Sequence, residues 1–198
     1  MTDKNVSIMN IGSMGYLPQV FKKIENEKKL NIVYLGGSIT MGCNATKTEL
    51  RYVDRSAKWW QTNFPDAEIS YFNAGIGATT SQFGVARVQE HVLDKQPDLV
   101  FVEFSVNDSS SPLFMETYES LVRRLLKAES VKAVVLINNL FYDTGTNAQG
   151  IHNAIGLHYD LPIVSVRNYI FPEIQLGNVC RLHSGYAPPY RPRSQDDS

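Results

Sequence analysis

The sequence predicts a three-layer α/β/α sandwich, in which helices cover both faces of a doubly wound parallel sheet of five strands. Two observations lead to this prediction. Strand-like and helix-like segments alternate from about residue 17 to 176, and no internal repeat or linker interrupts them. The strand-like segments are also almost continuously apolar, which is typical of parallel strands buried on both faces. A length of 198 residues is enough for one such domain with a sizeable core.

The elements follow one another in the order that this fold requires. The apolar runs predict strands at residues 31–35, 69–72, 99–104, 131–137 and 163–166. Segments with helical periodicity lie before and between them, at residues 20–24, 56–61, 83–93, 115–127 and 149–158. This order is flavodoxin-like, and ligands of such sheets bind at the carboxyl ends of the strands. Residues that carry chemistry are therefore expected directly after strands.

Composition and charge exclude several classes of function. The formal net charge of −1 gives no electrostatic reason to expect nucleic acid or an anionic membrane as a partner. The N-terminal segment lacks the basic and apolar regions of a secretory signal, and no apolar run approaches the roughly 20 residues of a membrane span. Cys43 and Cys180 form neither a disulfide framework nor a zinc site. We therefore expect a cytoplasmic protein with two reduced thiols and no metal or cofactor.

Three polar clusters follow the first three predicted strands. The first is Gly36–Thr40, where two glycines allow a sharp turn that places Ser38 at the start of a helical turn. A serine in that place can act as nucleophile and offer its own N–H to a developing oxyanion. The second is Asn73–Ser81, whose backbone N–H groups can point into the same crevice. The third is Ser105–Asp108, in which Asn107 supplies a neutral amide donor.

Each cluster alone has other interpretations. A glycine-rich loop after a first strand also suits a phosphate, but this chain lacks the Gly-Lys-Ser/Thr ending of a nucleotide-binding loop. Thr80 replaces the last glycine of a dinucleotide-binding Gly-x-Gly-x-x-Gly, and Thr40 replaces the last glycine of a Gly-x-Ser-x-Gly elbow. A plain turn is the alternative for each cluster taken singly, because glycine and asparagine commonly form turns.

Together, in this order and after successive strands, the clusters resemble the first three sequence blocks of the SGNH (GDSL-like) hydrolases, a family of serine esterases and lipases. The resemblance covers about residues 17 to 179. It implies that Ser38 attacks an acyl carbonyl. It also implies that the oxyanion is held by the N–H groups of Ser38 and Ala78 and by the side chain of Asn107. The family usually has glycine where this chain has Ala78, which keeps the N–H if the local backbone tolerates a Cβ atom.

The last block of that family, Asp-x-x-His, supplies the general base and the carboxylate that orients it. This chain contains no Asp-x-x-His. His91 ends a predicted helix away from the strand ends, so we expect a structural or solvent-facing role for it. His152 and His158 fall on the helix before the fifth strand, so we expect no catalytic role for either. His183 lies after the last strand, where the base belongs, but Cys180 stands in the place of the aspartate and a neutral thiol orients an imidazole poorly. His183 is therefore the candidate base, and the absence of any base is the alternative.

The final segment sets a limit to the predicted domain. We expect an SGNH-hydrolase-like domain at residues 1–179 and an atypical tail at residues 180–198. A frame-shifted or truncated end would explain the abrupt change in character. Several codons are possible for each residue from Ser184 to Asp197. When suitable codons are chosen and read one base later, they encode an Asp-x-x-His-Pro block. The gene sequence tests this hypothesis.

The leading interpretation is a serine ester hydrolase that acts on small acyl esters through an acyl-enzyme on Ser38. The resemblance suggests acetyl esters, including those of carbohydrates. Trp59 and Trp60 are candidates for stacking on sugars or, as helix aromatics, for the core. The alternative function is that of a catalytically impaired protein of the same fold that binds a ligand or acts as a scaffold. A flavodoxin-like cofactor module is a third interpretation that rests on fold analogy alone.

Overall fold

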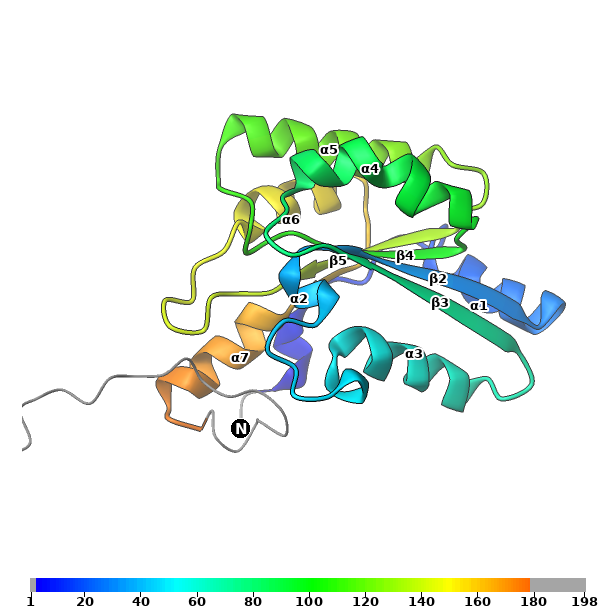
Figure 1. The fold of residues 1–198 in the computed structure, drawn as a ribbon, viewed down its shortest axis with the longest axis horizontal. Helices are drawn as coiled ribbons and strands as arrows, with labels where there is room; N and C mark the ends of the chain where they lie inside the picture. The colour runs from blue at the N-terminus through cyan, green and yellow to red at the C-terminus, as the bar shows by residue number, and fades with distance from the viewer. Residues whose placement is uncertain (1–2, 179–198) are drawn as a thin grey trace, which may run out of the picture.

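The computed structural model describes residues 3–178, which form three layers around one mixed sheet of six strands (Figure 1). The order of the strands across the sheet is β1-β6-β5-β4-β2-β3. Their bounds are β1 (Ile8–Asn10), β2 (Lys29–Gly36), β3 (Glu68–Gly75), β4 (Leu99–Glu103), β5 (Ala133–Asn138) and β6 (Ile163–Ser165). β2 to β6 run parallel to one another, whereas the short edge strand β1 pairs antiparallel with β6.

The helices divide between the two faces of the sheet (Figure 1). One face is covered by α4 (Ser81–His91), α5 (Pro112–Leu126) and α6 (Gln149–His158), and we call it the α4/α5/α6 face. The other is flanked by α1 (Leu17–Glu27), α3 (Tyr52–Asn63) and α7 (Val166–Gln175), and we call it the α1/α3/α7 face. A single turn, α2 (Ser38–Met41), follows β2, and the short 3₁₀ helices are η1 (Lys4–Ser7), η2 (Thr48–Leu50) and η3 (Leu93–Lys95).

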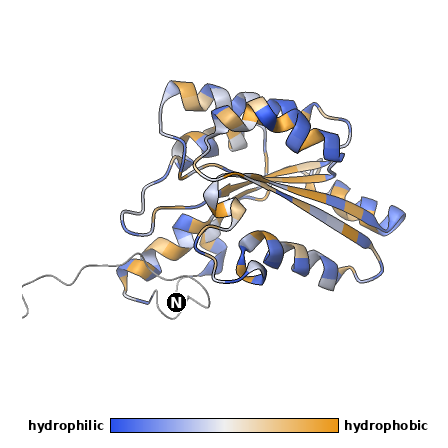
Figure 2. Ribbon diagram, viewed as in Figure 1, coloured by the Kyte–Doolittle hydropathy of each residue, from blue (hydrophilic) through white to orange (hydrophobic). Residues whose placement is uncertain are grey.

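Both faces of the sheet contribute to a hydrophobic core, because successive side chains of a strand point to opposite faces. In β2, Val33 and Leu35 belong to the core under α4 and α5, whereas Ile32 and Tyr34 belong to the core beside α1 and α3. The strands are accordingly hydrophobic along most of their length (Figure 2). Two-sided burial is the reason that the strands read as nearly continuous apolar runs.

The predicted fold class is confirmed, and the sheet carries one strand more than the five expected. β1 is too short for a periodic signal, since it has three residues, and all of them are partly or fully exposed. β3 is longer than the predicted run at residues 69–72, because its backbone pairs with β2 from Glu68 to Gly75. α7 has no counterpart among the predicted helices, and it contains Pro172, a residue that normally ends a helix.

The order of the strands determines where a ligand can bind. After β2 the chain adds β3 on one side, and it then crosses to add β4 on the other side of β2. This reversal leaves a crevice at the carboxyl ends of β2 and β4, which is where open α/β sheets bind their ligands. α2 begins at that end of β2 (Figure 1). The first and third polar clusters of the sequence therefore flank the crevice.

Candidate active site

Ser38 is the first residue of α2 and is reached from β2 through a turn at Gly36 and Gly37. Both glycines are buried, and neither position has room for a side chain. A Cβ atom at Gly36 would collide with the side chain of Thr40 and would lie 2.6 Å from the carbonyl oxygen of Glu103. The close approach of β4 and α2 to this turn is therefore what requires glycine before Ser38.

Asn107 lies against the same turn. A Cβ atom at Gly37 would come within 2.5 Å of Asn107 Oδ1 and within 3.3 Å of the carbonyl oxygen of Thr79. Gly37 is thus the point where the loops after β2, β3 and β4 meet. Asn107 Oδ1 is buried and accepts no hydrogen bond from the described residues. The structure therefore brings Asn107 against Gly37, the residue that precedes Ser38.

Ala78, in the loop between β3 and α4, has a left-handed backbone with φ of 57°. A residue with a Cβ atom adopts this conformation at a cost of about 1–2 kcal/mol, which glycine does not incur. The loop is held by its own hydrogen bond, since Thr79 Oγ1 donates to the carbonyl of Ile76 at 2.7 Å. Ala78 therefore keeps the backbone conformation for which glycine is suited, together with its N–H.

The carboxyl end of β3 also packs directly on α2. Asn73 Nδ2 donates to the carbonyl of Thr40 at 2.8 Å, and Asn73 Oδ1 accepts from the N–H of Gly75 at 2.9 Å. The N–H of Ile76 donates to the carbonyl of Gly36 at 3.1 Å. The second polar cluster is thus tied to the residues on both sides of Ser38.

Glu103, the last residue of β4, is a fully buried carboxyl group that lies outside the three predicted polar clusters. Ser105 Oγ donates to Glu103 Oε1 at 3.3 Å, and Thr40 Oγ1 lies 3.5 Å from Oε2. Burial raises the pKa of Glu103 to about 7, although hydrogen bonds from Ser105, Asn139 and Thr40 oppose the rise. The sequence signal for this residue is a single glutamate at the end of an otherwise apolar strand.

A second buried polar contact joins the third cluster to α4 and α6. Asp108 Oδ2 lies 3.0 Å from His152 Nε2, and neither side chain is exposed to solvent. Asp108 Oδ1 accepts from the N–H of Ser81 at 2.9 Å, and the ring of Tyr118 stacks on the imidazole at 3.6 Å. Burial lowers the pKa of His152, and the nearby Asp108 opposes this shift. We therefore treat His152 as a neutral imidazole that donates to Asp108 and holds the loop that carries Asn107.

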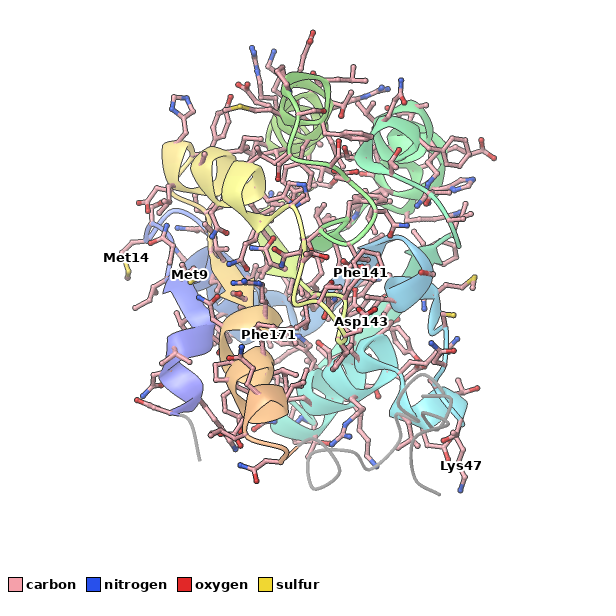
Figure 3. All side chains as sticks on the ribbon, turned by 90° about the vertical axis from the view of Figure 1, so that its left-hand side faces the viewer. Met9, Met14, Lys47, Phe141, Asp143 and Phe171 are labelled. Atoms are coloured by element: carbon pink, nitrogen blue, oxygen red, sulfur yellow. The ribbon has the colours of Figure 1, made fainter. Side chains whose placement is uncertain are left out.

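Ser38 lines a cavity of about 670 Å³ on the α1/α3/α7 side of the sheet. Its apolar lining includes Phe101, Val135, Ile137 and Val164, and its polar lining includes Asn44, Arg51, Arg55, Asn139 and Asp143. Phe141 also belongs to the lining, and both it and Asp143 lie in the loop between β5 and α6, near the middle of the face that Figure 3 shows.

Trp59 and Trp60, the candidates for stacking on sugars, do not line this cavity. Trp60 is buried among core aromatics, and Trp59 is half-exposed.

None of the three described histidines lines the cavity beside Ser38. His91 Nδ1 lies 3.3 Å from a guanidinium nitrogen of Arg87, and the ring of His158 contacts that of Tyr159. His183, the candidate base, lies outside the described residues, as does Cys180. Within residues 3–178, Cys43 is an exposed free cysteine.

This architecture, with a serine turn at the sheet reversal and an asparagine beside it, is that of a hydrolase-type α/β domain. A model of the GDSL-like lipase/acylhydrolase family matches residues 34–169, and the chain belongs to this family. No match was found among proteins with curated annotation. Within residues 3–178, no helix is long and apolar enough to cross a bilayer.

Solved structures extend the comparison. The chain is similar to a two-domain esterase (CEX) active on acetylated mannans, with 46% identity and a TM-score of 0.87 over 89% of this chain and 48% of that one. The same esterase was also co-crystallized with mannopentaose. The chain thus spans about half the length of that relative. The fold is shared with a catalytic mutant of Axe2, an acetylxylan esterase from Geobacillus stearothermophilus, at 19% identity and a TM-score of 0.60 over 72% of this chain and 80% of that one.

Proposed function

We propose that this chain is a serine ester hydrolase that cleaves small acyl esters, in particular acetyl esters of carbohydrates. The observation that carries the proposal is the meeting of three loops at Gly37, where Asn107 lies against the backbone that leads to Ser38. A nucleophile beside an amide donor at the edge of a cavity is an arrangement suited to acyl transfer.

In this proposal Ser38 Oγ, whose proton passes to a general base, attacks the ester carbonyl. The C–O bond to the alcohol then breaks, the alcohol leaves with that proton, and water hydrolyses the acyl-enzyme to release the carboxylic acid and regenerate Ser38. The negative charge that develops on the carbonyl oxygen is stabilised by the N–H groups of Ser38 and Ala78 and by the side-chain amide of Asn107. Loss of one such donor typically lowers the rate by about 10²–10³, so Asn107→Ala is the sharpest test of the oxyanion hole.

Deprotonation of Ser38 requires a general base, and His183 is the base that we propose. It lies outside residues 3–178, and no described histidine lines the cavity. This last observation favours a second candidate function, in which the chain binds an acylated ligand with an impaired catalytic site. An oxyanion hole and substrate binding alone can retain about 10³–10⁴ of rate enhancement over water, so even an impaired site is measurable.

Carbohydrate acetyl esters are the substrates that the neighbours and the cavity support best. The 46% identical relative acts on acetylated mannans, and the more distant Axe2 is an acetylxylan esterase. In this chain the cavity beside Ser38 combines apolar lining with arginine, asparagine and aspartate side chains. Such a lining offers contacts for an acetyl methyl group and hydrogen bonds for sugar hydroxyls.

The test compares p-nitrophenyl acetate hydrolysis and acetate release from acetylated mannan in the wild-type protein and in Ser38→Ala, Asn107→Ala and His183→Ala. Cys43→Ala is the matched control, because this exposed thiol lines the same cavity and has no role in the proposal. We expect Ser38→Ala and Asn107→Ala to lose activity and the control to retain it. Unchanged turnover in Ser38→Ala would exclude the nucleophile. Wild-type activity in His183→Ala would exclude that base, and binding of acetylated mannan without turnover would identify the second candidate.

A further inference from the structure

Arg87, on the inner side of α4, is a buried cation that the proposed reaction does not use. Only 6% of its surface is exposed, and it forms no ion pair with a carboxylate among residues 3–178. Burial accordingly lowers the pKa of its guanidinium group. Removal of a charge from water without a counter-ion costs several kcal/mol in proteins. The hydrogen bonds that Arg87 donates must therefore offset this cost.

Those contacts are two backbone carbonyls at the end of the sheet. Arg87 Nη2 donates to the carbonyl of Gly36 at 3.0 Å, and Nη1 donates to the carbonyl of Ala74 at 2.6 Å. Gly36 is the last residue of β2, and Ala74 is the last but one of β3. One planar group therefore joins the carboxyl ends of two neighbouring strands.

Each of these strands leads into a loop with a proposed oxyanion donor. Gly36 precedes Ser38 by two residues, and Ala74 precedes Ala78 by four. The carbonyl of Gly36 also accepts from the N–H of Ile76, so a backbone hydrogen bond joins the starts of the two loops in addition to Arg87. A change in the separation of these carbonyls would move the N–H of Ser38 relative to that of Ala78.

We propose that Arg87 is a positioning residue, whose guanidinium group fixes the distance between the backbone donors of Ser38 and Ala78. This inference rests on the proposed function of the site. The planar fork of arginine can hold two acceptors at a fixed separation, whereas the ammonium group of lysine is a single point of donation. Misplacement of reacting groups by about 1 Å can cost 10²-fold in rate, so a positioning residue has a measurable effect.

Two further side chains lie beside the guanidinium group. The ring of Phe83 lies 5.8 Å from Arg87 Cζ, and His91 Nδ1 lies 3.3 Å from Nη1. Both residues belong to α4 itself. Phe83→Leu is therefore a matched control, because it changes a neighbour of the guanidinium group on the same helix and leaves both carbonyl contacts intact.

The experiment measures kcat and KM for p-nitrophenyl acetate in Arg87→Met, Arg87→Lys and Phe83→Leu, each corrected for the folded fraction from thermal unfolding. We expect kcat to fall about 10- to 100-fold in Arg87→Met with little change in KM, because the donors act on the transition state. Arg87→Lys keeps the charge and one contact, and we expect a loss of about 10-fold. Phe83→Leu keeps the wild-type kcat.

A purely structural role would lower the folded fraction and leave kcat per folded molecule unchanged, which would overturn the proposal. Full kcat in Arg87→Lys would also overturn it, because charge alone would then suffice. If Arg87→Met does not fold, the rate at which a fluorophosphonate labels Ser38 in Arg87→Lys decides between these outcomes. Wild-type turnover in Ser38→Ala would instead show that the proposed function has failed. If Ser38→Ala is inactive and the Arg87 variants are fully active, only the positioning role of Arg87 is excluded.

Discussion

The two faces of the sheet differ in how closely their helices approach it. On the α4/α5/α6 face, a Cβ atom at Gly156 would lie 2.6 Å from Ile163 Cδ1 and 2.8 Å from Leu136 Cδ1. Gly84 leaves equally little room, since a Cβ atom there would lie 2.8 Å from the ring of Phe104. At both positions the helix packs closely enough that an added Cβ atom meets a buried neighbour.

The α1/α3/α7 face instead contains the cavity of about 670 Å³ beside Ser38. Phe101, Ile137 and Val164 line it and are only partly buried, although they lie on central strands of the sheet. The two faces of the sheet therefore have different structural roles. The tightly packed face holds the loops that carry Asn107 and Ala78, and the open face leaves space for a ligand next to Ser38, the proposed nucleophile.

The largest expected effect concerns the buried polar contacts of Asp108 on the α4/α5/α6 face, which we expect to contribute to the free energy of unfolding. Asp108→Ala leaves the N–H of Ser81 and the imidazole N–H of His152 without an acceptor, and two such buried donors cost about 3–5 kcal/mol of unfolding free energy. Urea denaturation measures this loss. Tyr118→Phe is the control, because its buried hydroxyl has no hydrogen-bond partner among the described residues and its removal should change stability by less than about 1 kcal/mol. Equal effects of the two substitutions would contradict the assigned role of Asp108.

The second effect concerns Glu103, whose side chain lies under α2. Its pKa is about 7 in the folded protein, above the ordinary value of 4.5. The folded state therefore binds more protons than the unfolded state between these pH values, and the free energy of unfolding falls as pH rises through this window. The shift corresponds to about 3 kcal/mol in all.

Glu103→Gln should remove this dependence, because the amide does not titrate. Urea denaturation of the wild-type protein and the variant at pH 5 and pH 8 provides the measurement. Glu68→Gln is a matched control, since that carboxylate is 75% exposed and should leave the pH dependence unchanged. A wild-type pH dependence that persists in Glu103→Gln would show that another group causes it.

A third prediction compares two glycines of α6. Gly156→Ala should cost about 1–3 kcal/mol, because the new methyl group overpacks the contact with Ile163 and Leu136. Gly150→Ala in the same helix has nothing within 4 Å of the new Cβ atom, and it should stabilise the protein by about 0.5–1 kcal/mol through helix propensity. Thermal unfolding of both variants tests the tight packing of this face. A stabilising effect of Gly156→Ala would be inconsistent with it.

Much of this architecture follows from the sequence, because local patterns determine it. Apolar runs predict the five parallel strands, and the rule that chemistry follows strand ends selects the clusters that contain Ser38 and Asn107. The meeting of these clusters at Gly37 is a consequence of parallel topology, in which carboxyl ends lie at one edge of the sheet. A short exposed edge strand such as β1 carries no periodic signal and is missed.

The supporting contacts could not be predicted in the same way. Arg87 and Gly36 are 51 residues apart, and Asp108 and His152 are 44 residues apart. Such pairs depend on the exact placement of a helix over the sheet, which no local pattern encodes. The left-handed backbone of Ala78 is likewise set by its loop, because alanine has no preference for positive φ.

The smallest expected effect compares two valines that face opposite sides of neighbouring strands. Val164, on β6, lines the cavity, and Val164→Leu should change the unfolding free energy by less than about 0.5 kcal/mol, because the added methylene enters open space. Val134, on β5, is fully buried in the core under α5, and Val134→Leu should cost about 1–3 kcal/mol through overpacking. Urea denaturation of the pair isolates the packing of each face, since the chemical change is identical. A cost for Val164→Leu as large as that for Val134→Leu would mean that the cavity is closed in solution, and the space assigned to a ligand beside Ser38 would then be absent.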